Sequence, residues 1–249
     1  MFYLDFMRKL SLFIVVLAAC SSQYQPKSVQ FKDYKITNAS AVDSNYVKML
    51  KPFGDSVRVL MSETVGRLDQ TLNKENNGGP LGNFMSDAFL TMARLKFNEP
   101  IDAAFMNAGG VRLTQLPAGK ITRGTIFELM PFDNALILVK IKGDTLQSFL
   151  NLVAARGGWP VSGMTIQIKN KKAVNVVIGG KPLDPASTYT ITLSDFIANG
   201  GDNAYILKDL PRVNKNYLVR DALIEYVSSF EKQGKSVLIN NEIRVTYAQ

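Results

Sequence analysis

The pattern of apolar and polar positions predicts a domain that mixes helices with strands. Its strongest helical segment covers residues 81–97, where apolar side chains recur every three or four positions and share one face. The residues of that face are Leu81, Phe84, Met85, Ala88, Phe89, Met92 and Leu95. A second amphipathic helix is predicted at 217–230, and shorter ones at 126–130 and 146–155. We expect the long aromatic and methionine face to lie in the core.

Runs of β-favouring residues alternate irregularly with these helices. The predicted strands are 66–72, 101–106, 136–141, 164–168, 173–178, 189–193 and 243–247. Residues 164–178 form a predicted hairpin with a solvated tip at Lys169–Lys172, while 73–80 is a loop and 181–185 a turn. Because no regular βαβ repetition is present, the pattern favours an α+β fold: a single domain with a mixed β-sheet and packed helices.

The first part of the chain reads as a targeting segment and a linker. Arg8 and Lys9 precede an apolar run that ends at Cys20, as in a secretory signal, and this run is too short to span a bilayer. Leu17-Ala18-Ala19-Cys20 resembles the lipobox of bacterial lipoproteins, which implies cleavage before Cys20 and lipidation of its thiol. The alternative is a plain signal peptide with an incidental cysteine.

These features predict three parts of the chain and a location. Residues 1–19 are the signal peptide, 20–45 a lipidated flexible tether, and 46–249 the folded domain. Near-helical spacing continues across 46–61, but Pro52 and Gly54 interrupt it. The protein is expected in the bacterial cell envelope, anchored by lipid at the periplasmic face or the cell surface.

Composition narrows the chemistry that the chain can perform. It holds no histidine and one cysteine, so it lacks the usual general base and the commonest metal ligand. Ser162 is not enclosed by a Gly-x-Ser-x-Gly motif and has no histidine to activate it. We therefore predict no catalytic residue and no metal site in this chain. The net charge of +8, with a pI near 9.5, favours anionic ligands without specifying them.

Two glycine-containing loops follow predicted strands and could bind a ligand. After 101–106, Gly109 and Gly110 could present backbone N–H groups, and Arg112 a guanidinium, to an anion. After 189–193, Phe196 offers a flat apolar face, and Asp202 follows an adjacent glycine pair. Each loop could equally be an ordinary surface connection. On residues alone, the chain reads as a ligand-binding module.

A larger ordered set of segments gives a more specific indication. In chain order the segments are Pro80-Leu81-Gly82-Asn83, Asn107-Ala108-Gly109-Gly110-Val111-Arg112, Leu129-Met130-Pro131-Phe132-Asp133-Asn134, Val161-Ser162-Gly163, Lys181-Pro182-Leu183-Asp184-Pro185 and Phe196-Ile197-Ala198-Asn199-Gly200-Gly201-Asp202. Together they resemble the C-terminal, substrate-binding domain of the 5'-nucleotidase family, which includes UDP-sugar hydrolases and cyclic phosphodiesterases. The resemblance covers roughly residues 46 to 210.

The resemblance implies a set of ligand contacts. Phe132 and Phe196 match two aromatics that sandwich a nucleobase, and Asp202 matches an acid that accepts hydrogen bonds from ribose hydroxyls. Asn107 and Arg112 match residues on the ribose and phosphate side. Gly109 and Gly110 would allow the ligand to approach the backbone closely.

The family also has an N-terminal catalytic domain that holds two metals through several histidines, which this sequence lacks. We therefore predict a nucleotide- or nucleoside-recognising domain that serves nucleotide catabolism. A separate metallophosphatase chain would supply the divalent metals. The ligand is a nucleotide or nucleoside and not a nucleic acid polymer. Two alternatives remain: a free-standing nucleoside-binding lipoprotein, and a degenerate domain kept as a structural or interaction module.

Overall fold

The computed structural model describes residues 27–35, 37, 41–75 and 77–248. Cys20 and the predicted signal peptide lie outside these residues. The chain divides into two units, residues 1–49 and 50–249, and each is described by itself. No helix of the described part is long and apolar enough to cross a bilayer.

Helix α2 (Ser44–Met61) joins the two units in sequence and continues through Pro52. The sequence predicted an interruption there, but the helix continues, and the hydroxyl of Ser56 donates to the Pro52 carbonyl at 3.1 Å. None of its residues is buried, although Leu50, Phe53 and Leu60 are large and apolar. The chain thus carries an exposed amphipathic helix ahead of its folded part.

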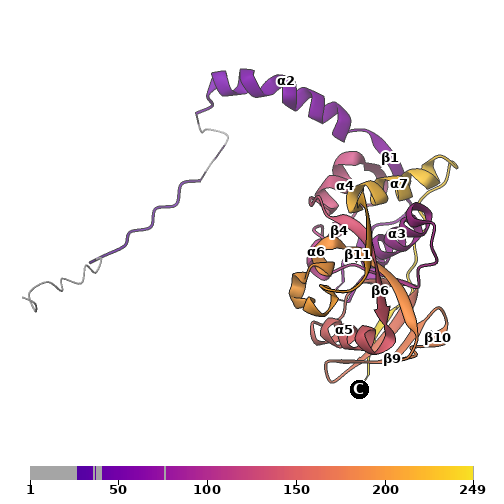
Figure 1. The fold of residues 1–249 in the computed structure, drawn as a ribbon. Helices are drawn as coiled ribbons and strands as arrows, with labels where there is room; N and C mark the ends of the chain where they lie inside the picture. The colour runs from indigo at the N-terminus through magenta and orange to yellow at the C-terminus, as the bar shows by residue number, and fades with distance from the viewer. Residues whose placement is uncertain (1–26, 36, 38–40, 76, 249) are drawn as a thin grey trace, which may run out of the picture. The chain divides into compact units, whose positions relative to one another are not determined.

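The second unit is built on a five-stranded sheet with the order β12-β6-β11-β3-β7 and a four-stranded sheet with the order β10-β9-β8-β13 (Figure 1). The strands of the first are β12 (Arg212–Leu218), β6 (Ala135–Lys142), β11 (Thr188–Ser194), β3 (Ala103–Phe105) and β7 (Val161–Ser162). Those of the second are β10 (Lys181–Pro182), β9 (Lys172–Ile178), β8 (Met164–Lys169) and β13 (Val245–Tyr247). Two short ladders pair β1 (Thr64–Leu68) with β5 (Gly119–Thr122), and β2 (Leu72–Asn73) with β4 (Gln115–Leu116).

Besides the end of α2, the described part of this second unit contains five helices. They are α3 (Gly79–Phe97), α4 (Arg123–Leu129), α5 (Gly143–Ala155), α6 (Asp195–Ala198) and α7 (Val219–Glu231). Three 3-10 turns are added: η1 (Ala108–Gly110), η2 (Gly201–Asn203) and η3 (Tyr205–Leu207). The predicted α+β class is confirmed.

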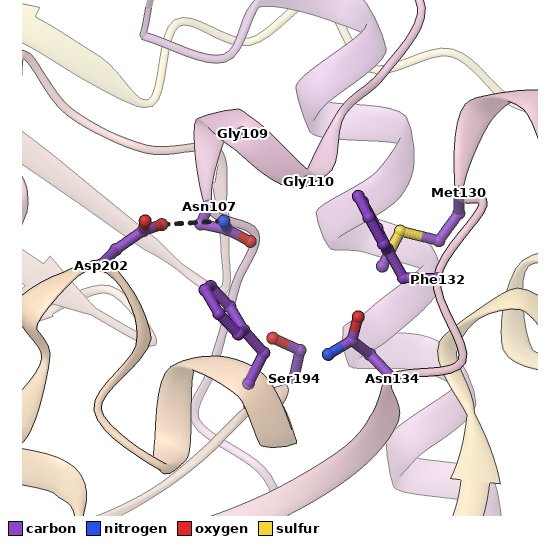
Figure 2. A pocket seen from close by; sticks show the side chains of 9 residues that line it. Asn107, Gly109, Gly110, Met130, Phe132, Asn134, Ser194 and Asp202 are labelled. Atoms are coloured by element: carbon purple, nitrogen blue, oxygen red, sulfur yellow. Dashed lines mark hydrogen bonds between the residues drawn. The ribbon is translucent and has the colours of Figure 1, made fainter.

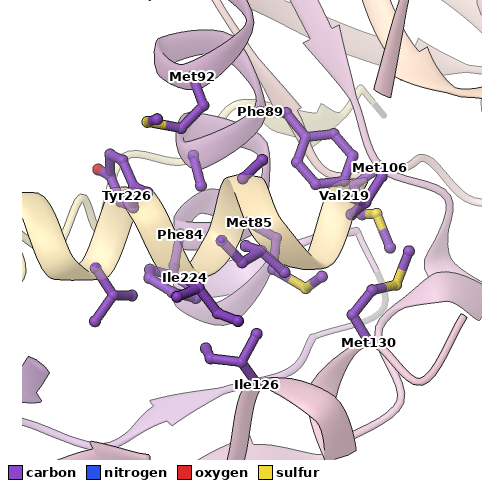
Figure 3. Packing of buried hydrophobic residues seen from close by; sticks show 14 of the residues in the cluster. Phe84, Met85, Phe89, Met92, Met106, Ile126, Met130, Val219, Ile224 and Tyr226 are labelled. Atoms are coloured by element: carbon purple, nitrogen blue, oxygen red, sulfur yellow. The ribbon is translucent and has the colours of Figure 1, made fainter. Parts of the chain in front are cut away.

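The central sheet is covered on both faces, which gives the unit two hydrophobic clusters. Successive residues of β6 point alternately to the two sides, so Leu138 joins a cluster with α3 and α7, while Ile137 and Val139 join one with α5 and the β8–β9 hairpin. We call these the α3 cluster and the α5 cluster. Figure 3 shows the α3 cluster, where Phe84 lies near Ile224 and Tyr226, and Phe89 lies near Val219 and Met106. Burial on both faces explains the continuous apolar run of β6.

The predicted elements also differ from the structure at other places. Leu95 was expected in the core but is 70% exposed, because the last turn of α3 buries Phe97 instead. The strand predicted at 66–72 is split between β1 and β2. Strand β12 was not predicted because its sequence is mostly polar and most of its residues are exposed at the sheet edge.

Candidate functional site

The topology of the central sheet brings three loops to one edge. β11 runs parallel to β3, with Thr192 opposite Ala104, and antiparallel to β6, with Ser194 opposite Leu136. The ends of β3 and β11 therefore lie beside the start of β6. The three loops that the sequence singled out follow β3, precede β6 and follow β11.

These loops enclose a pocket of about 280 Å³ (Figure 2). Its lining residues are Asn107, Gly109, Gly110, Met130, Phe132, Asn134, Ser194, Phe196 and Asp202. Six of the seven substrate-binding residues predicted from the sequence are in this set, although they are spread over about a hundred positions of the chain. The structure thus brings them together in one cavity.

Two phenylalanines leave part of their rings exposed to this pocket. Phe132 is 40% exposed and Phe196 is 48% exposed, whereas their neighbours Met130 and Ile197 are buried. Met130 belongs to the α3 cluster and Ile197 to the α5 cluster. Each aromatic therefore stands on a different part of the core, and both present apolar surface to the same cavity.

Asp202 and Asn107 form a polar pair at the pocket wall, on the side away from Phe132 in Figure 2. The Nδ2 group of Asn107 donates to Oδ2 of Asp202 at 2.8 Å. A carboxylate accepts several hydrogen bonds, so Asp202 can accept more from a ligand. Asp202 lies in the left-handed region at φ 50°, next to the chain reversal at Gly200. The local turn thus directs the carboxylate toward Asn107.

The two glycines of the Asn107 loop have different reasons to be glycine. A Cβ at Gly110 would meet Cε of Met106 at 2.2 Å and Oδ1 of Asn107 at 2.8 Å, so both of these side chains would have to shift. At Gly109 the nearest atom would be Nδ2 of Asn107 at 3.7 Å, which is ordinary contact. Gly109 is therefore not required by the packing around it, and leaving it bare keeps space on the pocket side.

Arg112 is the predicted site residue that does not line the pocket. Its guanidinium carbon lies 5.7 Å from the centre of the Phe132 ring, and its Nη1 donates to the Gly109 carbonyl at 3.3 Å. The side chain is exposed, so the cation lies beside the aromatic wall.

Met130, Asn134 and Ser194 line the pocket but were not among the ligand contacts predicted from the sequence. Asn134 donates through Nδ2 to Oδ1 of Asp195 at 3.0 Å, and Ser194 Oγ accepts from the Ile197 amide at 3.4 Å. Asn134 and Ser194 each stand two positions from one of the two phenylalanines. That spacing is the signal that could have pointed to them.

The described residues contain no group of three or more histidine, cysteine or acidic side chains that could hold a metal ion. The pocket itself offers one carboxylate, Asp202, which already accepts from Asn107. This donor set does not fit the two-metal site of a phosphohydrolase, which requires several ligands for each ion. The aromatic and polar lining of the pocket suits a ligand with a flat apolar part and hydrogen-bonding groups.

Comparison with known proteins identifies the family of the domain. Residues 60–209 match the family model described as the 5'-nucleotidase, C-terminal domain. The 5'-nucleotidase of Vibrio cholerae is 29% identical over 193 residues, which cover 75% of this chain and 34% of that protein. Protein UshA of Yersinia enterocolitica is 28% identical over 197 residues, or 77% of this chain and 36% of that protein.

A solved structure supports the same assignment at the level of the fold. The 5'-nucleotidase precursor from Thermus thermophilus superposes with a TM-score of 0.70 and 25% identity, over 84% of this chain and 44% of that one. The fold is an α+β domain with a candidate ligand pocket at one edge of its central sheet. The chain belongs to the family of 5'-nucleotidase C-terminal domains. It spans about a third of the length of the curated relatives named above.

Proposed function

We propose that this chain recognises the nucleoside part of a nucleotide for a 5'-nucleotidase-like phosphohydrolase. One observation carries the proposal: two half-exposed phenylalanines from separate loops line one pocket with the hydrogen-bonded pair Asn107 and Asp202. Aromatic faces stack on any nucleobase, and a carboxylate accepts hydrogen bonds from ribose hydroxyls. Arg112 beside Phe132 adds a cation near the pocket for an anionic ligand.

We further propose that a separate metal-binding chain carries out the hydrolysis. The sequence contains no histidine, and the described residues offer no metal-binding group. The purified protein should therefore release no phosphate from AMP, with or without Mg²⁺, Mn²⁺ or Zn²⁺. Metal-dependent release that persists through further purification steps would contradict this part of the proposal.

The ligand is tested by calorimetric titration of the protein with adenosine. Phe196→Ala should weaken binding by roughly 5- to 150-fold, because stacking contributes about 1–3 kcal/mol per base and about 1.4 kcal/mol corresponds to tenfold. Phe53→Ala is a matched control, since Phe53 is an exposed phenylalanine of α2 outside the pocket lining. Absence of binding by the wild-type protein, alone and with a metallophosphatase partner, would favour the structural or interaction module.

A free-standing nucleoside-binding protein would use the same pocket. The two functions differ in whether a phosphohydrolase co-purifies with the protein and depends on it. If a partner exists, Phe196→Ala should lower its kcat/KM for the nucleotide by a factor similar to the loss of affinity. Binding without any such partner would support the free-standing function.

The location in the cell envelope also remains a proposal. It rests on the basic and apolar segment that ends at Cys20. Cys20→Ser should release the protein from the membrane fraction, because a lipid would then be missing. Unchanged processing and membrane association of this variant would contradict the lipoprotein assignment.

A further inference from the structure

Two arginines from a single short segment contact the two loops that carry Phe132 and Phe196. Arg212 begins β12, and Arg220 lies in the first turn of α7, directly after β12 ends. Both stand beyond residue 209, where the match to the family model stops. The match to the family model therefore does not include this segment, and only the folded structure shows that it lies beside the site.

Arg220 holds the loop that carries Phe132. Its Nη1 donates to the Phe132 carbonyl at 3.3 Å, and its Nη2 donates to the Asp133 carboxylate. The guanidinium carbon also lies 4.2 Å from the centre of the ring of Phe127, which belongs to α4. The planar guanidinium therefore contacts both this ring and the Phe132 loop. Three different contacts fix one planar group.

Burial shows which of these contacts matter. The Arg220 side chain is 12% exposed, whereas Asp133 is 81% exposed. An ion pair with so exposed a partner contributes little, so the carbonyl contact and the stacking on Phe127 are the main fixing contacts. The Val219 amide adds a backbone hydrogen bond to the Asn134 carbonyl at 2.9 Å. The start of α7 therefore holds the loop on both sides of Asp133.

Arg212 holds the opposite wall in a similar way. Its Nη1 donates to the Ala198 carbonyl at 3.3 Å and to Oδ1 of Asn199 at 2.8 Å, at the end of the helical turn that carries Phe196. Its Nη2 donates to the Leu207 carbonyl at 3.2 Å. Arg212 thus links the two ends of the excursion that contains Asp202.

The strand between the two arginines sets their separation. β12 pairs with β6 from Arg212 opposite Val139 to Leu218 opposite Ala135. β6 leads directly from the Phe132 loop and also pairs with β11, which leads to Phe196. We propose that Arg212 and Arg220 are positioning residues that set the gap between Phe132 and Phe196 for a base. This proposal rests on the proposed function.

Double-mutant cycles with adenosine titration test the proposal in the full-length protein. Arg220→Met keeps the length of the side chain but removes the fork, and should weaken binding at least about 5-fold, as the loss of one stacking partner would. In a Phe132→Ala background the same change should have little further effect. In a Phe196→Ala background it should keep its effect. Arg212→Met should show the opposite dependence on the two phenylalanines.

Two further variants separate positioning from general stability. Arg220→Lys retains the charge but not the planar fork, so it should restore less than half of the lost affinity if geometry is decisive. Arg67→Met is the matched control, because Arg67 also donates to a backbone carbonyl, that of Gly234, away from the pocket. Arg67→Met should leave adenosine affinity unchanged. Equal losses in all single variants and backgrounds would overturn the proposal.

A measurement without ligand keeps the proposal testable if the proposed function fails. Chymotrypsin cleaves after exposed aromatic residues, and Phe132 lies in an exposed loop. Arg220→Met should accelerate cleavage after Phe132 by several-fold relative to wild type and Arg67→Met, under conditions where all three remain folded. Unchanged cleavage after Phe132 would show that Arg220 does not hold the loop. Faster cleavage without adenosine binding would contradict only the proposed function.

Discussion

The two aromatic walls of the pocket are built by different means. Phe196 lies in α6, a single helical turn whose start is fixed by local hydrogen bonds: Ser194 accepts from the Ile197 amide, and Asp195 accepts from the Phe196 amide at 2.8 Å. Arg212 adds a distant contact at the end of this turn. Phe132 lies in a loop without regular structure. Its backbone carbonyl accepts from Arg220, 88 positions later in the chain.

This difference shows how the chain obtains two similar surfaces from unlike backbones. A capped turn can be specified by neighbouring residues, because its hydrogen bonds close within a few positions. An irregular loop leaves its backbone groups without such partners, so they must come from elsewhere in the fold. The Phe132 wall should therefore respond more strongly to distant substitutions than the Phe196 wall.

The largest expected effect is on the free energy of unfolding, and it distinguishes core aromatics from the aromatics of the pocket wall. Phe89 is fully buried in the α3 cluster, so Phe89→Ala should lower the free energy of unfolding by about 3–5 kcal/mol. Phe196→Ala should change it by less than about 1 kcal/mol, because the ring is 48% exposed. Denaturant unfolding of both variants measures this. Comparable destabilisation would mean that Phe196 is a core residue.

A pair of glycine substitutions sharpens the comparison further. An alanine at Gly201 would place Cβ 2.6 Å from both the ring and the carbonyl oxygen of Phe196, so Gly201→Ala should cost about 1–3 kcal/mol and weaken adenosine binding. Gly109→Ala meets only Nδ2 of Asn107 at 3.7 Å and should leave stability unchanged. The added methyl group should reduce only the affinity for adenosine. If Gly109→Ala melts early or binds adenosine normally, the account of this loop is wrong.

Helix caps on the two sides should give smaller effects. Thr122 caps α4, ahead of the Phe132 loop, by accepting from the Thr125 amide at 3.1 Å. Thr122→Ala should cost about 1 kcal/mol of stability without changing adenosine affinity. Ser194→Ala removes a longer contact of 3.4 Å and a pocket group, so it should cost less stability but reduce affinity. Thermal melts and adenosine titrations of both variants measure these effects. A larger loss of stability in Ser194→Ala, or a loss of affinity in Thr122→Ala, would contradict this prediction.

An effect confined to alkaline solution is a pH dependence of the α3 cluster. Burial, and then the nearby Asp87 carboxylate, raise the pKa of Tyr226 to about 12. Because the folded pKa exceeds that of the unfolded chain, this stabilisation is complete below pH 10 and is lost as the pH rises toward 12. Tyr226→Phe should flatten the decline of unfolding free energy between these values. An identical decline in the variant would exclude Tyr226 as its source.

Much of the fold could be predicted from the sequence because it depends on local pattern. The apolar period of α3, the two-sided apolar run of β6 and the β8–β9 hairpin with its lysine-rich tip were all visible. β12 was not, because an edge strand with exposed polar residues lacks the alternation that marks a half-buried strand. Leu95 was misplaced because periodicity cannot show where the core ends along a helix.

The candidate site divides in the same way. The sequence by itself indicated loops that could bind a ligand, through glycine pairs and an aromatic at strand ends, and its lack of histidine limited the metal chemistry available. The family resemblance added the expectation that Phe132 and Phe196 contact a base. Only the tertiary structure decided that Phe132 and Phe196 face one cavity, because the register of β3, β11 and β6 sets which loops meet. It also placed Arg112 beside Phe132 and supplied Arg212 and Arg220 from β12 and α7. Such contacts join residues that are far apart in the chain, so they form only when the sheet has assembled.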